Sequence, residues 1–200
     1  MRFVLATNNP KKLAEMSAIL DHFGVEVVSP RDLGLHIEVE ETGSTFAENA
    51  MLKAKAVCEA AKLPAIADDS GLCVDALNGA PGVYSARYGG EELDDRGRYM
   101  LLLNSLRGQG SRSAHFACAI ACVFPGGDTL TAEGRVEGTI AYAPMGEGGF
   151  GYDPVFFYPP LRKTFGQLTA EEKHGISHRG KALEAFVEKL ATYLNKGTSK

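Results

Sequence analysis

Two adjacent aspartates, Asp68 and Asp69, interrupt the apolar segment AIADDSGLCV at residues 65–74. Like charges side by side repel each other, and a carboxylate beside a buried strand is costly unless a partner compensates it. Any fold of this chain must therefore place cations, hydrogen-bond donors or a metal ion opposite the two acids. The pattern around them predicts two short strands, joined by a turn at Asp-Asp-Ser-Gly.

Length and charge narrow the class of protein. A length of 200 residues is typical of one folded domain over residues 1–200. The formal net charge of −4 argues against a nucleic-acid coat or a membrane-surface protein. No apolar run has the length of an export signal or a membrane span, so we expect a cytoplasmic protein. The four cysteines are scattered, which predicts reduced core thiols at Cys58, Cys73, Cys118 and Cys122.

Hydrophobic periodicity predicts a mixed α/β organisation. Apolar runs at residues 2–7, 25–30 and 155–158 indicate strands, and the alternating segments 112–124 and 128–141 indicate a hairpin. Helical patterns follow Pro10 and cover 44–62, 94–106 and 179–194. Thr45 and Glu48 have the spacing of a capping box, so the second helix begins there.

The turn Thr7-Asn8-Asn9-Pro10-Lys11-Lys12 joins the first strand to the first helix. A helix N-terminus presents N–H groups and the positive end of the helix dipole, both of which favour a phosphate, and Lys12 adds a positive charge. The alternative is an ordinary capped helix with surface lysines.

Acidic residues recur in two segments, Glu40-Glu41 and Asp68-Asp69. Oxygen ligands from separate segments suit a Mg²⁺ ion that bridges protein and phosphates, whereas the alternative is a set of solvated loop acids. Lys53 follows Asn49 by one helical turn, and by itself it has the pattern of an exposed helix lysine.

Two further segments add binding groups. The loop EGGFGYDP at 147–154 combines glycines with an aromatic ring, which allows close approach and stacking of a flat ligand, whereas the alternative is a structural loop with one buried Phe. Lys173 and the segment Ile176-Ser177-His178-Arg179-Gly180 supply phosphate donors near the start of the last helix. Together these parts suit a nucleoside triphosphate.

Five blocks of this sequence resemble the inosine/xanthosine triphosphate pyrophosphatase family: TNNPKK, EETGSTFAENAMLKA, ADDSGLCVDALNGAPGVYSARY, GGFGYDPVFF and LTAEEKHGISHRGKA. They extend from the first strand to the last helix in the family's order. The resemblance implies an α/β fold in which an elongated mixed β-sheet with flanking helices forms two lobes around a central cleft. It also implies a homodimer, a Mg²⁺ cofactor, and hydrolysis of dITP, ITP or XTP to the monophosphate and pyrophosphate.

The resemblance also assigns roles residue by residue. It places the phosphate-binding turn at Thr7, Asn8, Asn9, Pro10, Lys11 and Lys12. Glu41 and Asp69 match metal and catalytic acids, with Asp69 as general base, and Ser70 matches a substrate contact. The base-binding loop corresponds to Phe150, Gly151, Tyr152 and Asp153. Donors around the base and phosphates correspond to Lys173, His178 and Arg179.

The sequence does not decide which of the two aspartates binds the metal and which orients the water. Because side chains alternate along a strand, Asp68 and Asp69 are expected on opposite sides, one holding the metal and the other orienting the attacking water. Lys12 and Lys53 would then meet the charge of the leaving pyrophosphate. Two rival functions remain, a transferase that uses another acceptor in place of water and a nucleotide sensor that binds without hydrolysis.

Overall fold

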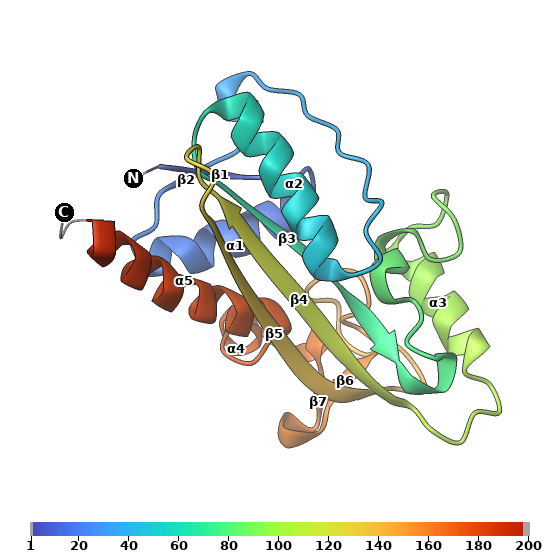
Figure 1. Ribbon diagram of the computed structural model, residues 1–200. Helices are drawn as coiled ribbons and strands as arrows, with labels where there is room; N and C mark the ends of the chain where they lie inside the picture. The colour runs from blue at the N-terminus through green and yellow to red at the C-terminus, as the bar shows by residue number, and fades with distance from the viewer. Residues whose placement is uncertain (1, 198–200) are drawn as a thin grey trace. The chain divides into compact units, whose positions relative to one another are not determined.

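The computed structural model describes residues 2–197 of the chain (Figure 1). Seven strands of this described part form one sheet in the order β2-β1-β3-β4-β5-β6-β7. Their bounds are β1 Phe3–Leu5, β2 Val27–Val28, β3 Ala65–Val74, β4 Ser113–Val123, β5 Thr129–Ile140, β6 Phe156–Tyr158 and β7 Lys163–Thr164. The α-helices are α1 Pro10–His22, α2 Phe46–Ala61, α3 Asp95–Ser105, α4 Ala170–His174 and α5 His178–Gly197.

The chain divides into two compact units. Unit 1 contains residues 1–69, 118–134 and 179–200, and unit 2 contains residues 70–117 and 135–178. Strands β3, β4 and β5 contribute residues to both.

Unit 1 is a three-layer arrangement. Strand β1 runs parallel to both β2 and β3. Helix α2 covers one face of these strands, and helices α1 and α5 cover the other (Figure 1). Capping residues define where two of the helices begin: Asn9 caps α1, and Thr45 forms the expected capping box with Glu48 at the start of α2.

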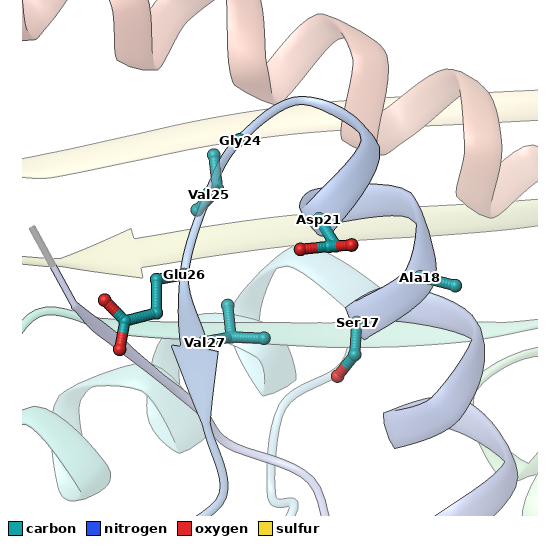
Figure 2. A pocket seen from close by; sticks show the side chains of 7 residues that line it. All are labelled: Ser17, Ala18, Asp21, Gly24, Val25, Glu26 and Val27. Atoms are coloured by element: carbon teal, nitrogen blue, oxygen red, sulfur yellow. The ribbon is translucent and has the colours of Figure 1, made fainter.

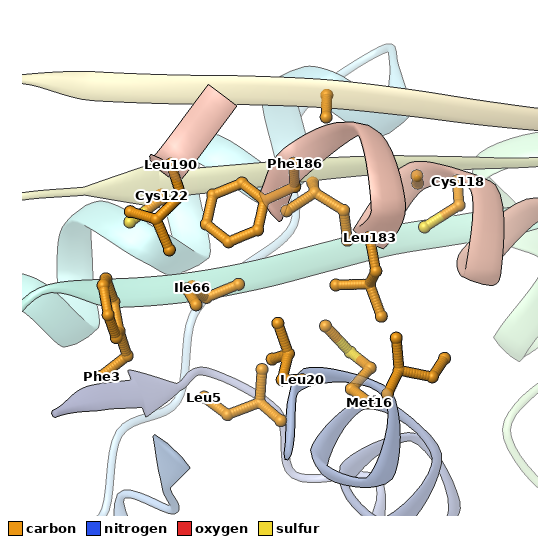
Figure 3. Packing of buried hydrophobic residues seen from close by; sticks show 14 of the residues in the cluster. Phe3, Leu5, Met16, Leu20, Ile66, Cys118, Cys122, Leu183, Phe186 and Leu190 are labelled. Atoms are coloured by element: carbon orange, nitrogen blue, oxygen red, sulfur yellow. The ribbon is translucent and has the colours of Figure 1, made fainter. Parts of the chain in front are cut away.

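Side chains of the unit 1 strands alternate between the two layers. Ile66 of β3 belongs to the core beneath α1 and α5, which also contains Leu5, Met16 and Phe186 (Figure 3). Ala65 and Ala67 instead belong to the core beneath α2. This alternation sets the direction of every later residue of β3 within unit 1.

Unit 2 has its own apolar core. Strand β6 pairs antiparallel with both β5 and β7. Buried side chains from β3, α3, β4 and the segment 152–168 pack together, and aromatic rings dominate the cluster, with Phe116, Tyr152, Phe156 and Phe165 among them. Phe116 lies 4.6 Å from Phe156, centroid to centroid, in a tilted contact.

The expectation of two short strands around Asp-Asp-Ser-Gly is wrong. Residues 65–74 form the single strand β3, with no turn at the aspartates. Both carboxylates have cationic or amide partners in unit 1, so the strand can continue through them. Turn chemistry in the sequence was overridden by tertiary contacts that the sequence does not display.

Two other expectations concern membranes and cysteines. Across residues 2–197, none of the helices has the length and apolar character needed to cross a membrane. All four cysteines are free thiols, as predicted, and Cys58, Cys118 and Cys122 are buried, whereas Cys73 is half-buried.

Candidate active site

Asp68 lies on the same face of β3 as Ile66, toward α1 and α5. Its side chain is completely buried, and its Oδ2 atom lies 3.0 Å from the Nζ atom of Lys12 in the first turn of α1. Arg179, at the start of α5, donates to the same oxygen from Nη2 at 3.2 Å and from Nε at 3.3 Å. Two cations from two helices therefore converge on one buried carboxylate.

Arg179 has a second carboxylate partner. Its Nη1 atom donates to Oε2 of Glu15 at 2.8 Å, and the guanidinium side chain is only 2% exposed. Glu15 lies three residues after Lys12, so both side chains extend from neighbouring positions on one face of α1. Glu15, Arg179, Asp68 and Lys12 thus form a charge-balanced row of two acids and two bases, which we call the Asp68 row.

The row determines the ionisation of its central members. Burial by itself raises the pKa of Asp68, but the charges of Lys12, Arg179 and Lys53 outweigh it and hold the pKa far below its ordinary value of 3.8. Burial also opposes the charge of Arg179, yet Asp68 and Glu15 raise its pKa further above the ordinary range. Asp68 is therefore permanently ionised at neutral pH.

Asp69 lies on the opposite face of β3, toward α2. Its Oδ2 atom accepts a hydrogen bond from Nδ2 of Asn49 at 3.1 Å. Its Oδ1 atom lies 3.5 Å from Nζ of Lys53, which also contacts Oε1 of Glu41 at 2.6 Å. The predicted separation of Asp68 and Asp69 to opposite sides is confirmed, and strand alternation is its cause. We call Glu41, Asn49, Lys53 and Asp69 the Asp69 group.

Asp69 differs from Asp68 in its pKa. Burial raises the pKa of Asp69, and the nearby Glu41 carboxylate raises it further, so that the lowering effects of Lys53, Lys12 and Asn49 do not fully compensate. For Lys53, burial favours the neutral amine, but Asp69, Asp68 and Glu41 together raise its pKa. The Asp69 group therefore contains a carboxylate whose proton affinity is higher than that of an exposed aspartate.

The residues of the Asp69 group fit a hard divalent cation. Among residues 2–197, no three His, Cys, Asp or Glu side chains form a complete protein-only metal site. Glu41 and Asp69, however, both direct a carboxylate oxygen at the same point, which the Lys53 ammonium now neutralises. Two carboxylates with further positions left to water and phosphate oxygens form the donor set that Mg²⁺ uses with nucleotides.

The turn at Thr7–Lys12 differs from expectation in one respect. Oδ1 of Asn9 accepts hydrogen bonds from the backbone N–H groups of Lys11 and Lys12, at 2.9 and 3.2 Å, and Thr7 Oγ1 accepts from the Asn9 N–H at 3.2 Å. The first-turn N–H groups that were expected to bind a phosphate are therefore used by the cap. The Lys12 ammonium and the helix dipole remain as the anion-attracting elements of this turn.

Unit 2 contains the loop of residues 147–154 and its support. Nζ of Lys173 lies 2.7 Å from Oδ2 of Asp153, and both side chains are buried. The same carboxylate oxygen accepts the backbone N–H of Phe150 at 2.8 Å. Lys173 also stands over the Phe150 ring, 4.9 Å from its centroid, in cation–π geometry. One buried ion pair therefore fixes both ends of the turn from Phe150 to Asp153.

Glycine is required in this loop. Gly149 has φ +71°, and a Cβ atom there would lie 2.0 Å from Oδ2 of Asp153. Tyr152 is buried and donates its hydroxyl proton to the carbonyl of Ser85 at 2.9 Å, which anchors the loop in unit 2. Phe150 is half-buried.

The adjacent residues His178 and Arg179 belong to different units. His178 is buried in unit 2 and stacks on Phe116, with centroids 4.6 Å apart and an interplanar angle of 12°. Arg179 is part of the Asp68 row in unit 1. Ser70 is half-buried and is the first residue of β3 that belongs to unit 2.

Sequence reasoning missed three residues that hold the others in place. Asn49 is fully buried, and besides contacting Asp69 it accepts the Gly43 N–H through Oδ1 at 2.8 Å. Glu15 carries one end of the Asp68 row. Asp95, in the first turn of α3, accepts the N–H of Gly151 at 2.9 Å. One signal in the sequence could have identified Asn49. It is a polar residue that stands among the apolar, inward-facing positions of the helical pattern.

A separate hollow lies beside α1 and β2. It has a volume of about 460 Å³ and is lined by Ser17, Ala18, Asp21, Gly24, Val25, Glu26 and Val27 (Figure 2). The side chains shown include two carboxylates and no cation, so this hollow does not suit a phosphate.

The fold and these clusters define an α/β protein in which one strand presents two carboxylates on its opposite faces, each beside different cations. A model described as the Ham1 family matches residues 3–189. The chain therefore belongs to the Ham1 family.

Individual relatives agree with this assignment. The chain is 50% identical to a dITP/XTP pyrophosphatase from Leptospira interrogans serogroup Icterohaemorrhagiae serovar copenhageni (strain Fiocruz L1-130). The 193 aligned residues cover 96% of this chain and 98% of the relative. It is 50% identical to a dITP/XTP pyrophosphatase from Bacillus subtilis (strain 168), over 94% of this chain and 96% of the relative. The solved Ham1 protein of Staphylococcus aureus superposes with a TM-score of 0.87 at 44% identity, over 96% of this chain and 100% of that chain.

Proposed function

We propose that this protein hydrolyses non-standard purine nucleoside triphosphates, namely dITP, ITP, XTP and dXTP, to the monophosphate and pyrophosphate. The curated relatives named dITP/XTP pyrophosphatase support the substrate class. The observation that carries the proposal is the Asp69 group, where a buried carboxylate stands beside a lysine, an asparagine amide and a second carboxylate. Such a group suits orientation and deprotonation of an attacking water.

The reaction is a displacement at the α-phosphorus. Asp69 accepts a hydrogen bond from the attacking water and takes up its proton, while Asn49 holds the carboxylate in orientation. The water oxygen bonds to the α-phosphorus, and the bond between that phosphorus and the oxygen bridging to the β-phosphate breaks. Pyrophosphate then leaves in line with the attack.

Lysines of unit 1 meet the phosphate charge. Lys53 stands beside Asp69, and Lys12 projects from the N-terminal turn of α1, so both are placed to bind phosphate oxygens. The turn residues Thr7 to Lys12 support this role through the helix dipole. Arg179 stays a proposed donor to the substrate, and its guanidinium also holds Asp68 and Glu15 in place.

We assign the metal site to Glu41 and Asp69. When bound there, Mg²⁺ neutralises phosphate charge and lowers the pKa of a coordinated water. Asp68 was also expected among the metal ligands, and its pairing with Lys12 and Arg179 now favours a positioning role for it.

Base recognition belongs to unit 2 in this proposal. The half-buried Phe150 ring offers a stacking surface, and the turn Phe150–Asp153 presents backbone groups that glycine leaves uncovered. Hypoxanthine and xanthine carry a 6-oxo acceptor where adenine carries a donor, so a buried donor such as Lys173 or His178 discriminates against adenine. Guanine shares the 6-oxo group and must be rejected at its 2-amino group.

The test uses the purified protein with Mg²⁺ and, separately, dITP, XTP, dGTP and dATP, with identification of the released anion. Pyrophosphate from dITP and XTP, with little from dGTP or dATP, is the expected result. Orthophosphate would move the cut to the γ-phosphate and refute the mechanism. Binding of dITP without release of either anion would favour the nucleotide sensor, and transfer to an acceptor other than water would favour the transferase.

We also propose that residues 1–200 act as one domain, that the protein is a cytoplasmic homodimer, and that it needs neither nucleic acid nor membrane. The family resemblance supports the dimer, and the acidic net charge of −4 supports the absence of a nucleic-acid partner. Sedimentation equilibrium tests the assembly directly, because a dimer has twice the chain mass of 21.4 kDa.

A further inference from the structure

The turn from Phe150 to Asp153 has a hydrogen-bond donor that the turn itself does not use. The Asp153 N–H reaches the Phe150 carbonyl at 3.3 Å, and the Phe150 N–H reaches the Asp153 carboxylate at 2.8 Å. Gly151, inside the turn, has φ +62° and directs its N–H away from both of these bonds, to Oδ2 of Asp95 at 2.9 Å. Asp95 and Gly151 are 56 residues apart in the sequence, and both belong to unit 2.

The hydrogen bond between Gly151 and Asp95 attaches the turn to helix α3. Asp95 lies in the first turn of α3, and α3 contributes the buried side chains of Leu102 and, just beyond its end, Leu106 to the unit 2 core. A hydrogen bond to an ionised acceptor is stronger than one between neutral groups. The peptide that joins Phe150 to Gly151 is therefore fixed in orientation by α3, independently of the Lys173–Asp153 ion pair.

We propose that Asp95 is a positioning residue that determines base selectivity by fixing this peptide and, through it, the Phe150 ring. The inference rests on the proposed function, in which the turn binds the purine. A ring that stacks on a base and backbone groups that sit at its edge must be held within a fraction of an ångström to discriminate between purines. Asp95 supplies that restraint without touching the substrate itself.

The chain offers a matched control in the preceding residue. Asp94 caps α3, because its Oδ1 atom accepts the Gly97 N–H at 2.7 Å, a bond that stays within the helix end and does not involve the turn. Asp94→Ala therefore weakens the same helix end without removing the bond to Gly151. Asp95→Asn keeps an acceptor oxygen for the Gly151 N–H, whereas Asp95→Ala removes it.

The experiment measures kcat and KM for dITP and dGTP in the wild type and these three variants. We expect Asp95→Ala to raise the KM for dITP about tenfold, to change kcat little, and to lower the ratio of kcat/KM for dITP to that for dGTP by a similar factor. Asp95→Asn should retain most of the wild-type selectivity. Asp94→Ala should lower the melting temperature while leaving the selectivity ratio unchanged.

A second measurement follows the contact itself. In amide NMR spectra the Gly151 proton should move upfield in Asp95→Ala and stay near its wild-type position in Asp94→Ala. If Asp95→Ala does not fold, a comparison of Asp95→Asn with Asp95→Leu, similar in size but without an acceptor, replaces it. Wild-type KM and selectivity in Asp95→Ala, or an equal loss in Asp94→Ala, would overturn the inference. Failure of the proposed function is distinguishable, because the wild type itself would then release no pyrophosphate from dITP.

Discussion

Asp68 and Asp69 are chemically identical, buried neighbours on β3, yet they differ in their partners and in the direction of their pKa shifts. Asp68 is completely buried, bound by Lys12 and Arg179, and held far below its ordinary pKa. Asp69 contacts one ammonium group at 3.5 Å and one amide, and its pKa is raised. The difference arises from one step along a strand, which sends the two side chains into different layers.

The comparison separates stability from reactivity. A carboxylate with a lowered pKa stabilises the folded protein when it is ionised, whereas one with a raised pKa destabilises it in the ionised form. Asp68 therefore contributes to the fold, and Asp69 is tolerated at a cost in folding free energy. Functional groups commonly carry such a cost. Each prediction below tests this division between the two aspartates.

The largest expected effect is on activity, in Asp69→Asn. Loss of the base should reduce kcat for dITP by about 10²–10⁴-fold. The melting temperature should equal or exceed that of the wild type, because the variant removes a buried charge with raised pKa and the new side-chain amide oxygen can still accept from Asn49. Steady-state pyrophosphate release and thermal unfolding measure the two quantities. Near-normal turnover in this variant would refute the assignment of Asp69 as the base.

The second effect is on stability, in Asp68→Asn. The substitution leaves the buried Arg179 and the half-buried Lys12 with only Glu15 as a compensating acid, and breaking such a pair costs about 3–5 kcal/mol. For a chain of this size the melting temperature should fall by roughly 6–20 °C. Asp69→Asn is the matched control, since it makes the same chemical change one residue away. Equal melting temperatures for the two variants would contradict the comparison.

The parts of this molecule that were predictable from sequence are those set by local chemistry. The capping box at Thr45, the helix after Pro10 and the opposite directions of Asp68 and Asp69 follow from periodicity and side-chain hydrogen bonding alone. The continuous strand β3 was not predictable, because the cations that stabilise its aspartates come from residues such as Lys12 and Arg179, far away in the sequence.

The same limit applies to the candidate site. The sequence and its family resemblance nominated Asp69, Lys12 and Lys53, which are polar residues in recognisable blocks. Glu15 and Asp95 were missed because the contact that gives each its proposed role is long-range, over 164 and 56 residues respectively. The assignment of Arg179 to the substrate stays a prediction, and the structure adds two carboxylate partners, Asp68 and Glu15, that the sequence did not indicate.

Asp68 and Asp69 should also differ in how each changes the stability of the protein with pH. The folded pKa of Asp68 lies below its ordinary value of 3.8, so its stabilisation is present above that pH and is lost as pH falls through the folded pKa. The folded pKa of Asp69 lies above 3.8, so its cost is absent at low pH and develops as pH rises through the folded pKa.

In the presence of a chelator, therefore, the wild type should be more stable than Asp68→Asn at neutral pH, and this gap should narrow as pH falls from neutral through the ordinary aspartate pKa of 3.8. Asp69→Asn should instead be more stable than the wild type at neutral pH, and this difference in unfolding free energy should also shrink toward low pH. Urea unfolding across this range measures both gaps. A gap for Asp68→Asn that widens on acidification would contradict the lowered pKa.

The smallest expected effect is at the end of the Asp68 row, in Glu15→Gln. Glutamine keeps an acceptor for Arg179 but removes one negative charge, and the Glu15 side chain is 19% exposed, so water screens part of the loss. We expect a loss of about 1 kcal/mol in unfolding free energy. Glu26→Gln provides the control. Glu26 pairs with Arg2 but is 61% exposed, so this substitution should cost less than about 0.5 kcal/mol.

In the double variant Glu15→Gln/Asp68→Asn, the two losses should not add, since both act on the Arg179 guanidinium. Simple additivity would mean that Glu15 stabilises α1 by itself, and that the row ends at Arg179.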